Sequence, residues 1–219
     1  MIRTKQMEFK EVVAKRKSVR EFKKDTIGKE VIADIIMEAG RAPSWVNAQE
    51  WKVFVATGHT LENIRNEFVR LSKEGVKGSA DFDTTHRTEW SEQAQKNMNS
   101  FYEYANSMHV GQRWDELENS FFDAPAVLFL CLPRTANKWA VLDLGGFEQT
   151  MLLAATNRGL GSIPAYNIVK YPDVIRKYID ISDEYDIAVG VAIGYVADTP
   201  INRIQSSRMT LDQFVIWKD

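Results

Sequence analysis

The sequence predicts an α+β fold in which helices wrap one small sheet. Strand-like segments are few along the 219 residues, and they do not alternate regularly with helices. The chain also has neither a Gly-x-Gly-x-x-Gly turn after a strand nor a phosphate-binding Gly-Lys-Ser/Thr loop, which argues against a doubly wound nucleotide-binding fold. A chain of this length can bury a sizeable core, and we expect residues 1–219 to form a single domain.

The composition is that of an ordinary globular protein, with 44% hydrophobic and 26% charged residues. A net charge of -2 gives no electrostatic reason to expect binding to nucleic acid or to an anionic membrane. No apolar run is long enough to span a bilayer, and residues 1–6 lack the apolar core of a signal peptide. We therefore expect a cytoplasmic protein with no nucleic-acid or membrane partner.

The first third of the chain reads as helix, helix, strand, helix. Helical spacing of apolar residues predicts helices at 7–16, 27–40 and 60–74, and the alternation in 51–58 predicts a strand. In the second of these helices we expect five residues to be buried: Val31, Ile32, Ile35, Ile36 and Ala39. Pro43 and Ser44 end that helix and start a loop.

Residues 75–123 differ from the rest of the chain. They begin as a polar stretch and return to helical periodicity at 90–108, and they are rich in aromatic side chains. Two interpretations stay open: a peripheral helical hairpin that packs on the core, or a lid that forms a wall of a substrate site. We call residues 75–123 the excursion.

The second half of the chain contains three further strand-like segments. The uninterrupted apolar run 126–132 predicts a buried strand, and its Cys131 is expected to be a buried, inert thiol. A short strand at 161–165, a helix at 172–179 and a strand at 187–196 follow.

Between the first two of these strands, residues 139–158 form the central helix. Its apolar residues surround most of the cylinder, which is typical of a helix inside a core or an interface. Two polar residues on it, Glu148 and Gln149, are expected to face a ligand or a partner subunit. The tail, 203–219, is basic first and apolar last, so its apolar part must be covered by its own core or by a second subunit.

The residues that could carry chemistry are mainly cationic. Arg16-Lys-Ser-Val-Arg20 is either a solvated surface patch or an anion cradle, because guanidinium groups match phosphate oxygens. His59, His86 and His109 lack the spacing of metal ligands, and no serine–histidine–acid set is recognisable. We therefore predict no metal site and no nucleophilic catalytic residue.

Four features in this order resemble the nitroreductase family of FMN-dependent oxidoreductases. They are Arg16–Arg20, Ala42-Pro-Ser-Trp-Val-Asn-Ala-Gln-Glu-Trp51, the central helix with Gly159-Leu-Gly-Ser-Ile-Pro164, and Arg208-Met-Thr-Leu-Asp-Gln-Phe-Val215. The helix at 90–108 is similar to that of nitrobenzoate-reducing members. The resemblance implies a mixed, mainly antiparallel sheet and an interlocked homodimer with a C-terminal extension at 203–219. It also implies bound FMN that accepts hydride from NADH or NADPH and reduces nitroaromatic or quinone-type small aromatic acceptors in a ping-pong cycle.

The resemblance assigns the cofactor site residue by residue. Phosphate and ribityl binding falls to Arg16, Lys17, Ser18, Ser206 and Arg208. Arg20 is placed near the pyrimidine end of the flavin, where its charge would stabilise the reduced ring. The loop residues Pro43, Ser44, Trp45 and Asn47 are assigned to the other subunit. Gln149 reaches the flavin from the central helix, and the backbone of Pro164, Ala165, Tyr166 and Asn167 lies by its reactive nitrogen.

The chain departs from the family pattern at three places. Glu50 stands where proline is common, Ala165-Tyr166 replaces an acidic residue of some members, and Trp45 is bulkier than the usual small residue. These departures keep other functions open: a specialised flavin enzyme such as a dehalogenase or a flavin-fragmenting oxygenase, or an FMN-binding protein without turnover. A regulatory dimer with a basic patch and no flavin is a further alternative.

Overall fold

The computed structural model describes residues 7–219, and its centre is one four-stranded sheet. The strands lie in the order β1-β2-β4-β3, and each neighbouring pair is antiparallel. Their bounds are Lys52–Thr57 (β1), Ala126–Pro133 (β2), Gly161–Ala165 (β3) and Tyr185–Gly194 (β4). The α+β prediction is confirmed, but within residues 7–219 the sheet is antiparallel rather than mixed. The segment around Ser18 makes only one parallel bridge, to Ser162, and then leaves the sheet.

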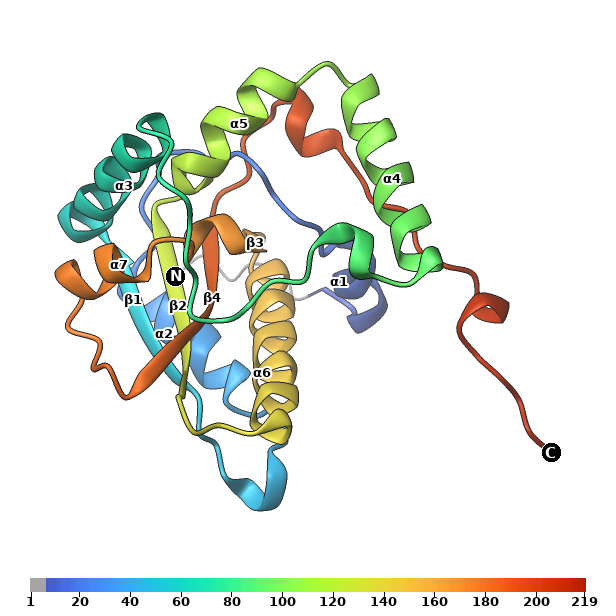
Figure 1. The fold of residues 1–219 in the computed structure, drawn as a ribbon. Helices are drawn as coiled ribbons and strands as arrows, with labels where there is room; N and C mark the ends of the chain where they lie inside the picture. Colours follow the sequence, from blue (N-terminus) through green and yellow to red (C-terminus); the bar gives the residue numbers. More distant parts are fainter. Residues whose placement is uncertain (1–6) are drawn as a thin grey trace.

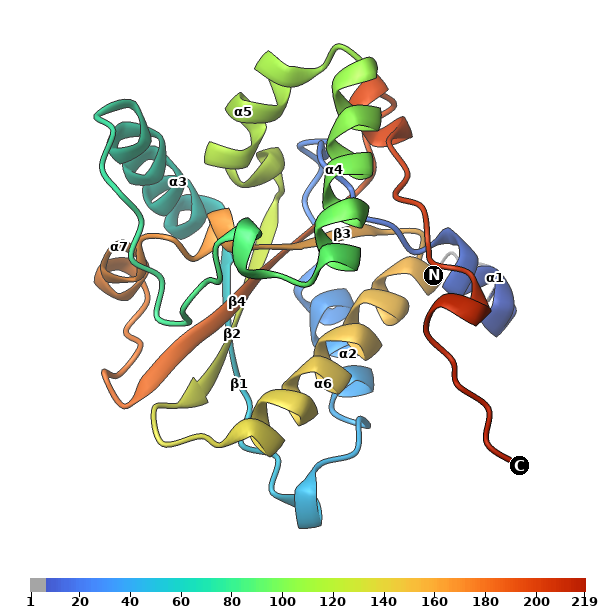
Figure 2. The ribbon, with the colours of Figure 1, turned by 45° about the vertical axis from the view of Figure 1, so that its right-hand side comes forward.

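Helices cover both faces of this sheet (Figures 1 and 2). Their bounds are Phe9–Lys15 (α1), Lys29–Ala39 (α2), Gly58–Lys73 (α3), Glu92–Ser107 (α4), Gly111–Asn119 (α5), Lys138–Asn157 (α6) and Pro172–Tyr178 (α7). The helices α2 and α6 pack on one face, and α3, α5 and α7 pack on the other. The predicted order of elements is thus confirmed, with ends that differ by a few residues.

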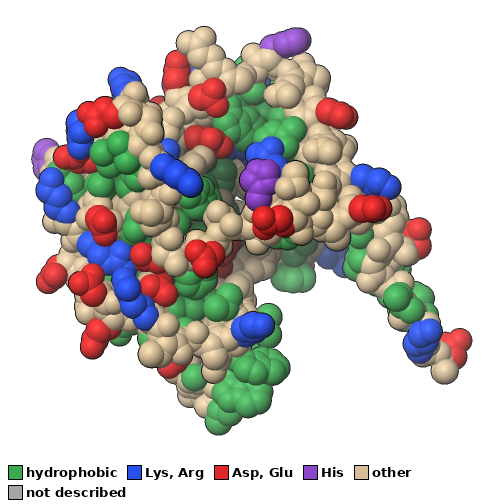
Figure 3. Space-filling model, in the orientation of Figure 1, with side chains coloured by type: hydrophobic (Ala, Val, Ile, Leu, Met, Phe, Trp, Pro, Cys, Tyr) green, Lys and Arg blue, Asp and Glu red, His purple; other side chains and the backbone are tan. Residues whose placement is uncertain are grey.

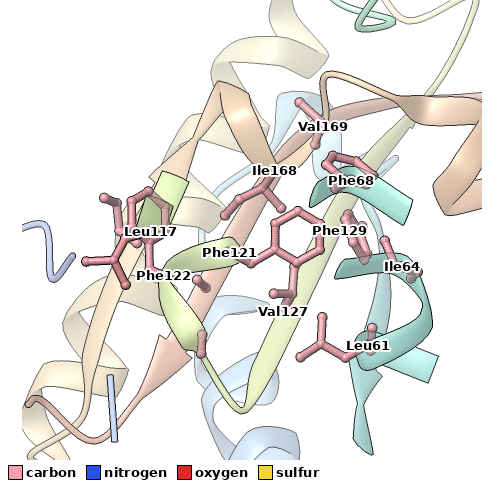
Figure 4. Packing of buried hydrophobic residues seen from close by; sticks show 14 of the residues in the cluster. Leu61, Ile64, Phe68, Leu117, Phe121, Phe122, Val127, Phe129, Ile168 and Val169 are labelled. Carbon is pink, nitrogen blue, oxygen red and sulfur yellow. The ribbon is translucent and has the colours of Figure 1, made fainter. Parts of the chain in front are cut away.

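Strand β2 is the centre of the core because it is buried on both faces, as its uninterrupted apolar run predicts. Successive side chains point to opposite faces of a strand. Leu128 and Leu130 therefore pack against α2 and α6, whereas Val127 and Phe129 pack against α3 and α5. Figure 4 shows Val127 and Phe129 among Leu61, Ile64, Phe68 and other side chains of that second layer.

Helix α6 ends as the sequence predicts, with Gly159 in the left-handed region at a φ of 76°. The amides of Gly159 and Leu160 bond back to the carbonyl groups of Thr156 and Ala155 at 2.9 and 3.0 Å, which satisfies the last turn. The chain then turns directly into β3. The position of the strand is therefore set by the end of the helix.

The helix is not buried all round, because one stripe of it faces outward. Trp139, Val141 and Leu142 are 52%, 43% and 64% exposed in this chain. Val31 on α2, expected in the core, is also exposed, whereas its neighbours Ile32 and Ile35 are buried. Val31 lies in the first turn of α2 and its side chain is exposed, so the apolar stripe of this helix is narrower than the sequence suggests.

The excursion divides into parts of different burial. Leu117 of α5 is fully buried in the core, so this helix is a packed element. The longer helix α4 has Ala105 as its one buried residue. The tail leaves the body of the protein in both views (Figures 1 and 2). Ile204 at its start is buried, whereas Leu211, Phe214, Ile216 and Trp217 are exposed.

Candidate functional site

Residues of α1, the middle of α6 and the tail line a cavity of about 770 Å³. We call it the cation cavity. It is lined by Val13, Ala14, Lys15, Arg16, Lys17, Gln149, Gln205, Ser206 and Arg208. Five of these residues were assigned to the cofactor from the sequence: Arg16, Lys17, Gln149, Ser206 and Arg208. The fold therefore brings together three segments that are far apart along the chain.

The electrostatics of the cation cavity suit a polyanion. Burial, and then the positive charge of Arg208, lower the pKa of Arg16, which means that the two guanidinium groups repel one another. Within residues 7–219 neither arginine forms a salt bridge, and no acidic residue lines the cavity. The Arg208 guanidinium donates to Ser206 Oγ at 2.7 Å, which holds it in place without neutralising it. A phosphate monoester, with nearly two negative charges, fits this donor set.

The segment 16–20 is held against the edge strand β3. The amide of Val19 donates to the carbonyl oxygen of Ser162 at 3.0 Å. Gly161 permits this approach, because a Cβ atom there would lie 2.6 Å from Val19 Cγ2. Since Pro164 is itself a residue of β3, the two segments assigned to the cofactor meet on this strand.

Asn202 also holds the same segment, through a role that no sequence pattern indicated. Its Oδ1 accepts from the amides of Arg20 and Glu21 at 2.7 and 3.2 Å, and its Nδ2 donates to the carbonyl oxygen of Glu21 at 2.7 Å. The backbone oxygen of Asn202 accepts from Lys17 Nζ. At 4% exposure the residue is buried with its amide group satisfied, so it orders the cationic segment.

Arg20 lies outside the lining of the cation cavity. Its guanidinium stands 4.6 Å from the ring centre of Trp114 and 5.5 Å from that of Phe101, and it donates to the carbonyl oxygen of Ser18 at 3.2 Å. Burial lowers its pKa, and the negative charge of Glu118 partly offsets this. Its assignment to the pyrimidine end of the flavin stays a prediction.

The end of β3 and the short 3-10 helix η4 (Tyr166–Ile168) carry the residues assigned to the reactive face of the flavin. Pro164, Ala165 and Asn167 are half-buried, and Tyr166 is exposed. The 16–20 segment attaches to the same strand at Ser162, two residues before Pro164. Their contact with a flavin stays a prediction.

The loop that carries Pro43, Ser44, Trp45 and Asn47 packs near the start of α6. The amide of Trp45 donates to Asp143 Oδ2 at 2.8 Å, and the rings of Trp45 and Trp139 are 4.8 Å apart. None of the four residues lines the cation cavity of the same chain. Figure 3 shows hydrophobic side chains gathered at this end, over the loop and the start of α6. The assignment of this loop to a partner subunit's site stays a prediction.

The two polar residues of the central helix have different surroundings. Gln149 lines the cation cavity, as the cofactor assignment requires. Glu148 is half-buried, and burial raises the pKa of its carboxyl group.

The remaining reactive candidate, Cys131, is fully buried, and burial raises the pKa of its thiol to about 12, so the prediction of a buried, inert thiol is confirmed. Residues 7–219 contain no group of three or more His, Cys, Asp or Glu side chains placed to bind a metal ion, and no helix among them could cross a membrane.

Comparison with known proteins agrees with the fold. A family model described as the nitroreductase family matches residues 13–195. A 4-nitrobenzoate reductase of Pseudomonas putida is 26% identical over 211 residues, which are 92% of this chain and 91% of that protein. A 4-nitrobenzoate reductase of Nocardioides sp. (strain LMS-CY) is 26% identical over 224 residues, covering 96% and 91%.

A solved structure shares the whole fold. The FMN-dependent nitroreductase of Mycobacterium smegmatis, crystallised in complex with NADPH, superposes with a TM-score of 0.89 at 23% identity. The match covers 96% of this chain and 97% of the other. The antiparallel sheet wrapped by helices is therefore a fold that this chain shares with that protein.

The chain belongs to the nitroreductase family. The resemblance predicted from the sequence is confirmed, including its link to nitrobenzoate-reducing members. The predicted class of enzyme, an NAD(P)H-dependent FMN oxidoreductase of the nitroreductase type, is confirmed at the level of the family.

Proposed function

We propose that this chain is a cytoplasmic, homodimeric oxidoreductase that binds FMN and reduces nitroaromatic or quinone-type acceptors with NADH or NADPH. The observation that carries the proposal is the pair Arg16 and Arg208, two guanidinium groups that face one cavity with no carboxylate among the residues that line it. The names of the relatives support the acceptor class, because they act on nitrobenzoate. When bound, FMN would supply the chemistry, accepting hydride from the nicotinamide and passing electrons to the acceptor.

The residues of the chain would bind and orient the cofactor rather than react. Arg16 and Arg208 would hold the phosphate, and Lys17, Ser18, Ser206 and Gln149 would complete the polar contacts along the ribityl chain. After Pro164, which has no N–H group, the backbone of Ala165, Tyr166 and Asn167 would present N–H groups to the ring. Hydrogen bonds to charged groups contribute roughly 1.5–3 kcal/mol each, so several of them can retain FMN without a covalent link.

We also propose the interlocked homodimer, with residues 1–219 acting as one domain. Exposed apolar side chains support it: Phe9 and Val13 on α1, the outer stripe of α6, and Leu211, Phe214, Ile216 and Trp217 in the tail. Strand β1 has a free edge, and an apolar groove of about 360 Å³ runs between it and α2. The tail of a second subunit would cover these surfaces. The loop at Pro43–Asn47, remote from the cation cavity of its own chain, would then complete the partner's site.

The visible absorption spectrum of the purified protein tests this proposal. Under anaerobic conditions, a flavin spectrum that bleaches with NADH or NADPH and returns on adding 4-nitrobenzoate is expected. A flavin that resists both nicotinamides would point to a binding protein without turnover. A flavin that both nicotinamides reduce and that neither 4-nitrobenzoate nor a benzoquinone reoxidises would favour a specialised flavin enzyme. A colourless protein that cannot take up added FMN would contradict the proposal.

A further inference from the structure

The side chain of Arg20 is held by an aromatic clamp from the excursion. Trp114 of α5 and Phe101 of α4 approach its guanidinium to 4.6 and 5.5 Å, and their own ring centres are 6.2 Å apart. Within residues 7–219 Arg20 forms no salt bridge. The rings contact the guanidinium group through cation–π interactions, and one of its N–H groups donates to the carbonyl oxygen of Ser18. The clamp therefore orients the cation without a directly paired carboxylate.

Trp114 is itself fixed in position, which makes it the stronger half of the clamp. Its Nε1 donates to Glu118 Oε1 at 2.5 Å, and its amide donates to the carbonyl oxygen of Val110 at 2.8 Å. The neighbouring Leu117 is fully buried in the core. Helix α5 therefore holds the indole against Arg20 from a rigid base.

The clamp adjoins the proposed cofactor site. Phe101 lines a cavity of about 390 Å³ together with Gln205 and Ser206, and both of these also line the cation cavity. On the backbone side, Asn202 binds the amide of Arg20 at 2.7 Å. Arg20 is thus fixed at its main chain by Asn202 and at its side chain by the excursion.

We propose that Trp114 is a positioning residue, which acts through Arg20 to set the reduction potential of the bound flavin. The inference rests on the proposed function and goes beyond it, because it gives the excursion a role in the electronic properties of the cofactor. A cation at fixed distance stabilises a reduced flavin that carries negative charge. Without the indole the guanidinium gains rotamers and turns toward water, which weakens that stabilisation.

Redox titration of the FMN-loaded protein tests this inference. We expect Trp114→Leu to shift the midpoint potential to a more negative value, and Trp114→Phe, which keeps an aromatic face, to restore most of it. In the Arg20→Ala background Trp114→Leu should cause no further shift. The affinity for FMN should change little, because the phosphate contacts lie elsewhere. Trp90→Leu, a substitution of an exposed tryptophan in the same excursion, is the matched control and should leave the potential unchanged.

The outcomes separate this inference from the proposed function. Failure of the wild-type protein to bind FMN would overturn both. The inference alone would be overturned if bound FMN had the same midpoint potential in the wild type and in Trp114→Leu. It would also be overturned if Trp114→Leu shifted the midpoint potential equally in the wild-type and the Arg20→Ala backgrounds. If Trp114→Leu does not fold, the comparison of Trp114→Phe with Phe101→Leu decides: both should shift the potential negatively and by less than Arg20→Ala, and no shift in either overturns the inference.

Discussion

At the scale of single residues, charge and its placement decide what the cation cavity can bind. Arg16 and Arg208 come from opposite ends of the chain, and the repulsion between them is a cost that the protein carries until an anion is bound. Two cations kept close together in this way are a sign of a binding site rather than of a surface patch. Of the two interpretations of Arg16–Arg20, the anion cradle is therefore the one we adopt.

Substitution of these arginines is the direct residue-scale prediction. Arg16→Ala and Arg208→Ala should each weaken FMN binding by about 10- to 150-fold, the range for a charged hydrogen bond of roughly 1.5–3 kcal/mol. Titration of the apoprotein followed by flavin fluorescence measures this. Arg203→Ala is the matched control, because Arg203 is an exposed arginine of the same tail outside the cavity lining. An equal loss of FMN affinity in the control would mean that nonspecific electrostatic attraction, rather than a defined binding site, holds the cofactor.

At the scale of elements, the excursion is attached to the sheet by one buried ion pair. Asp81 accepts from Arg176 of α7 at 2.8 and 3.3 Å, and its carboxylate also accepts from the amide of Ile187 in β4 at 2.7 Å. Both charged side chains are about nine-tenths buried, at 10% and 11% exposure. Asp81 thus joins the start of the excursion, a helix and a central strand.

Breaking this pair should be costly. Asp81→Ala would leave the Arg176 charge and the Ile187 amide without their partner, and we expect a loss of about 3–5 kcal/mol in the free energy of unfolding. Urea denaturation measures it. Asp183→Ala removes the other carboxylate near Arg176, but Asp183 is 92% exposed, so that variant should lose less than about 1 kcal/mol. Similar losses in the free energy of unfolding for both variants would show that burial of the Asp81–Arg176 pair adds nothing to stability.

The elements that could be predicted from the sequence are those whose signal is local. The run Ala126–Leu132 identifies β2, and Gly159 ends α6, because each pattern depends only on neighbouring residues. Asp81 could not be predicted, since its partners lie about 100 residues further along the chain. The left-handed residues Phe121, Phe122 and Asp123 were also missed, because no glycine marks that turn.

The contrast between local patterns and distant contacts also explains which residues of the candidate site could be predicted. Arg16 and Arg208 were found through their charge and the family pattern, and the cavity brings them together. Asn202 was missed because its role depends on hydrogen bonds to residues 181 and more positions away, and an asparagine just before the tail carries no sign of them. The exposed stripe of α6 was read as buried because a single chain leaves open what a second subunit would cover.

At the scale of the whole molecule, a single chain leaves a large apolar surface uncovered. Phe214 and Trp217 are 63% and 77% exposed on a tail that stands away from the body (Figure 1). Large exposed apolar side chains in a continuous segment are typical of an interaction surface. The proposed exchange of tails between subunits would bury them.

Removing these two side chains should therefore weaken the dimer. Burial of a large apolar side chain contributes about 1.5–3 kcal/mol, so Phe214→Ser with Trp217→Ser should raise the dissociation constant of the dimer by more than about 100-fold. Analytical ultracentrifugation over a dilution series measures it. The control pair Val76→Ser and Trp90→Ser changes exposed apolar residues of the excursion and should leave the mass unchanged. A monomeric wild-type protein would contradict the dimer itself.

Strand β3 lies at the edge of the sheet, whereas β2 and β4 form its centre. An edge strand has one ladder of hydrogen bonds, so its amides should exchange with deuterium long before those of the two central strands. Both segments assigned to the cofactor are attached to β3, through Val19 at one point and Pro164 at another. Fraying of this edge would open the site while the rest of the domain stays native. A flavin could thus be lost and reloaded without global unfolding.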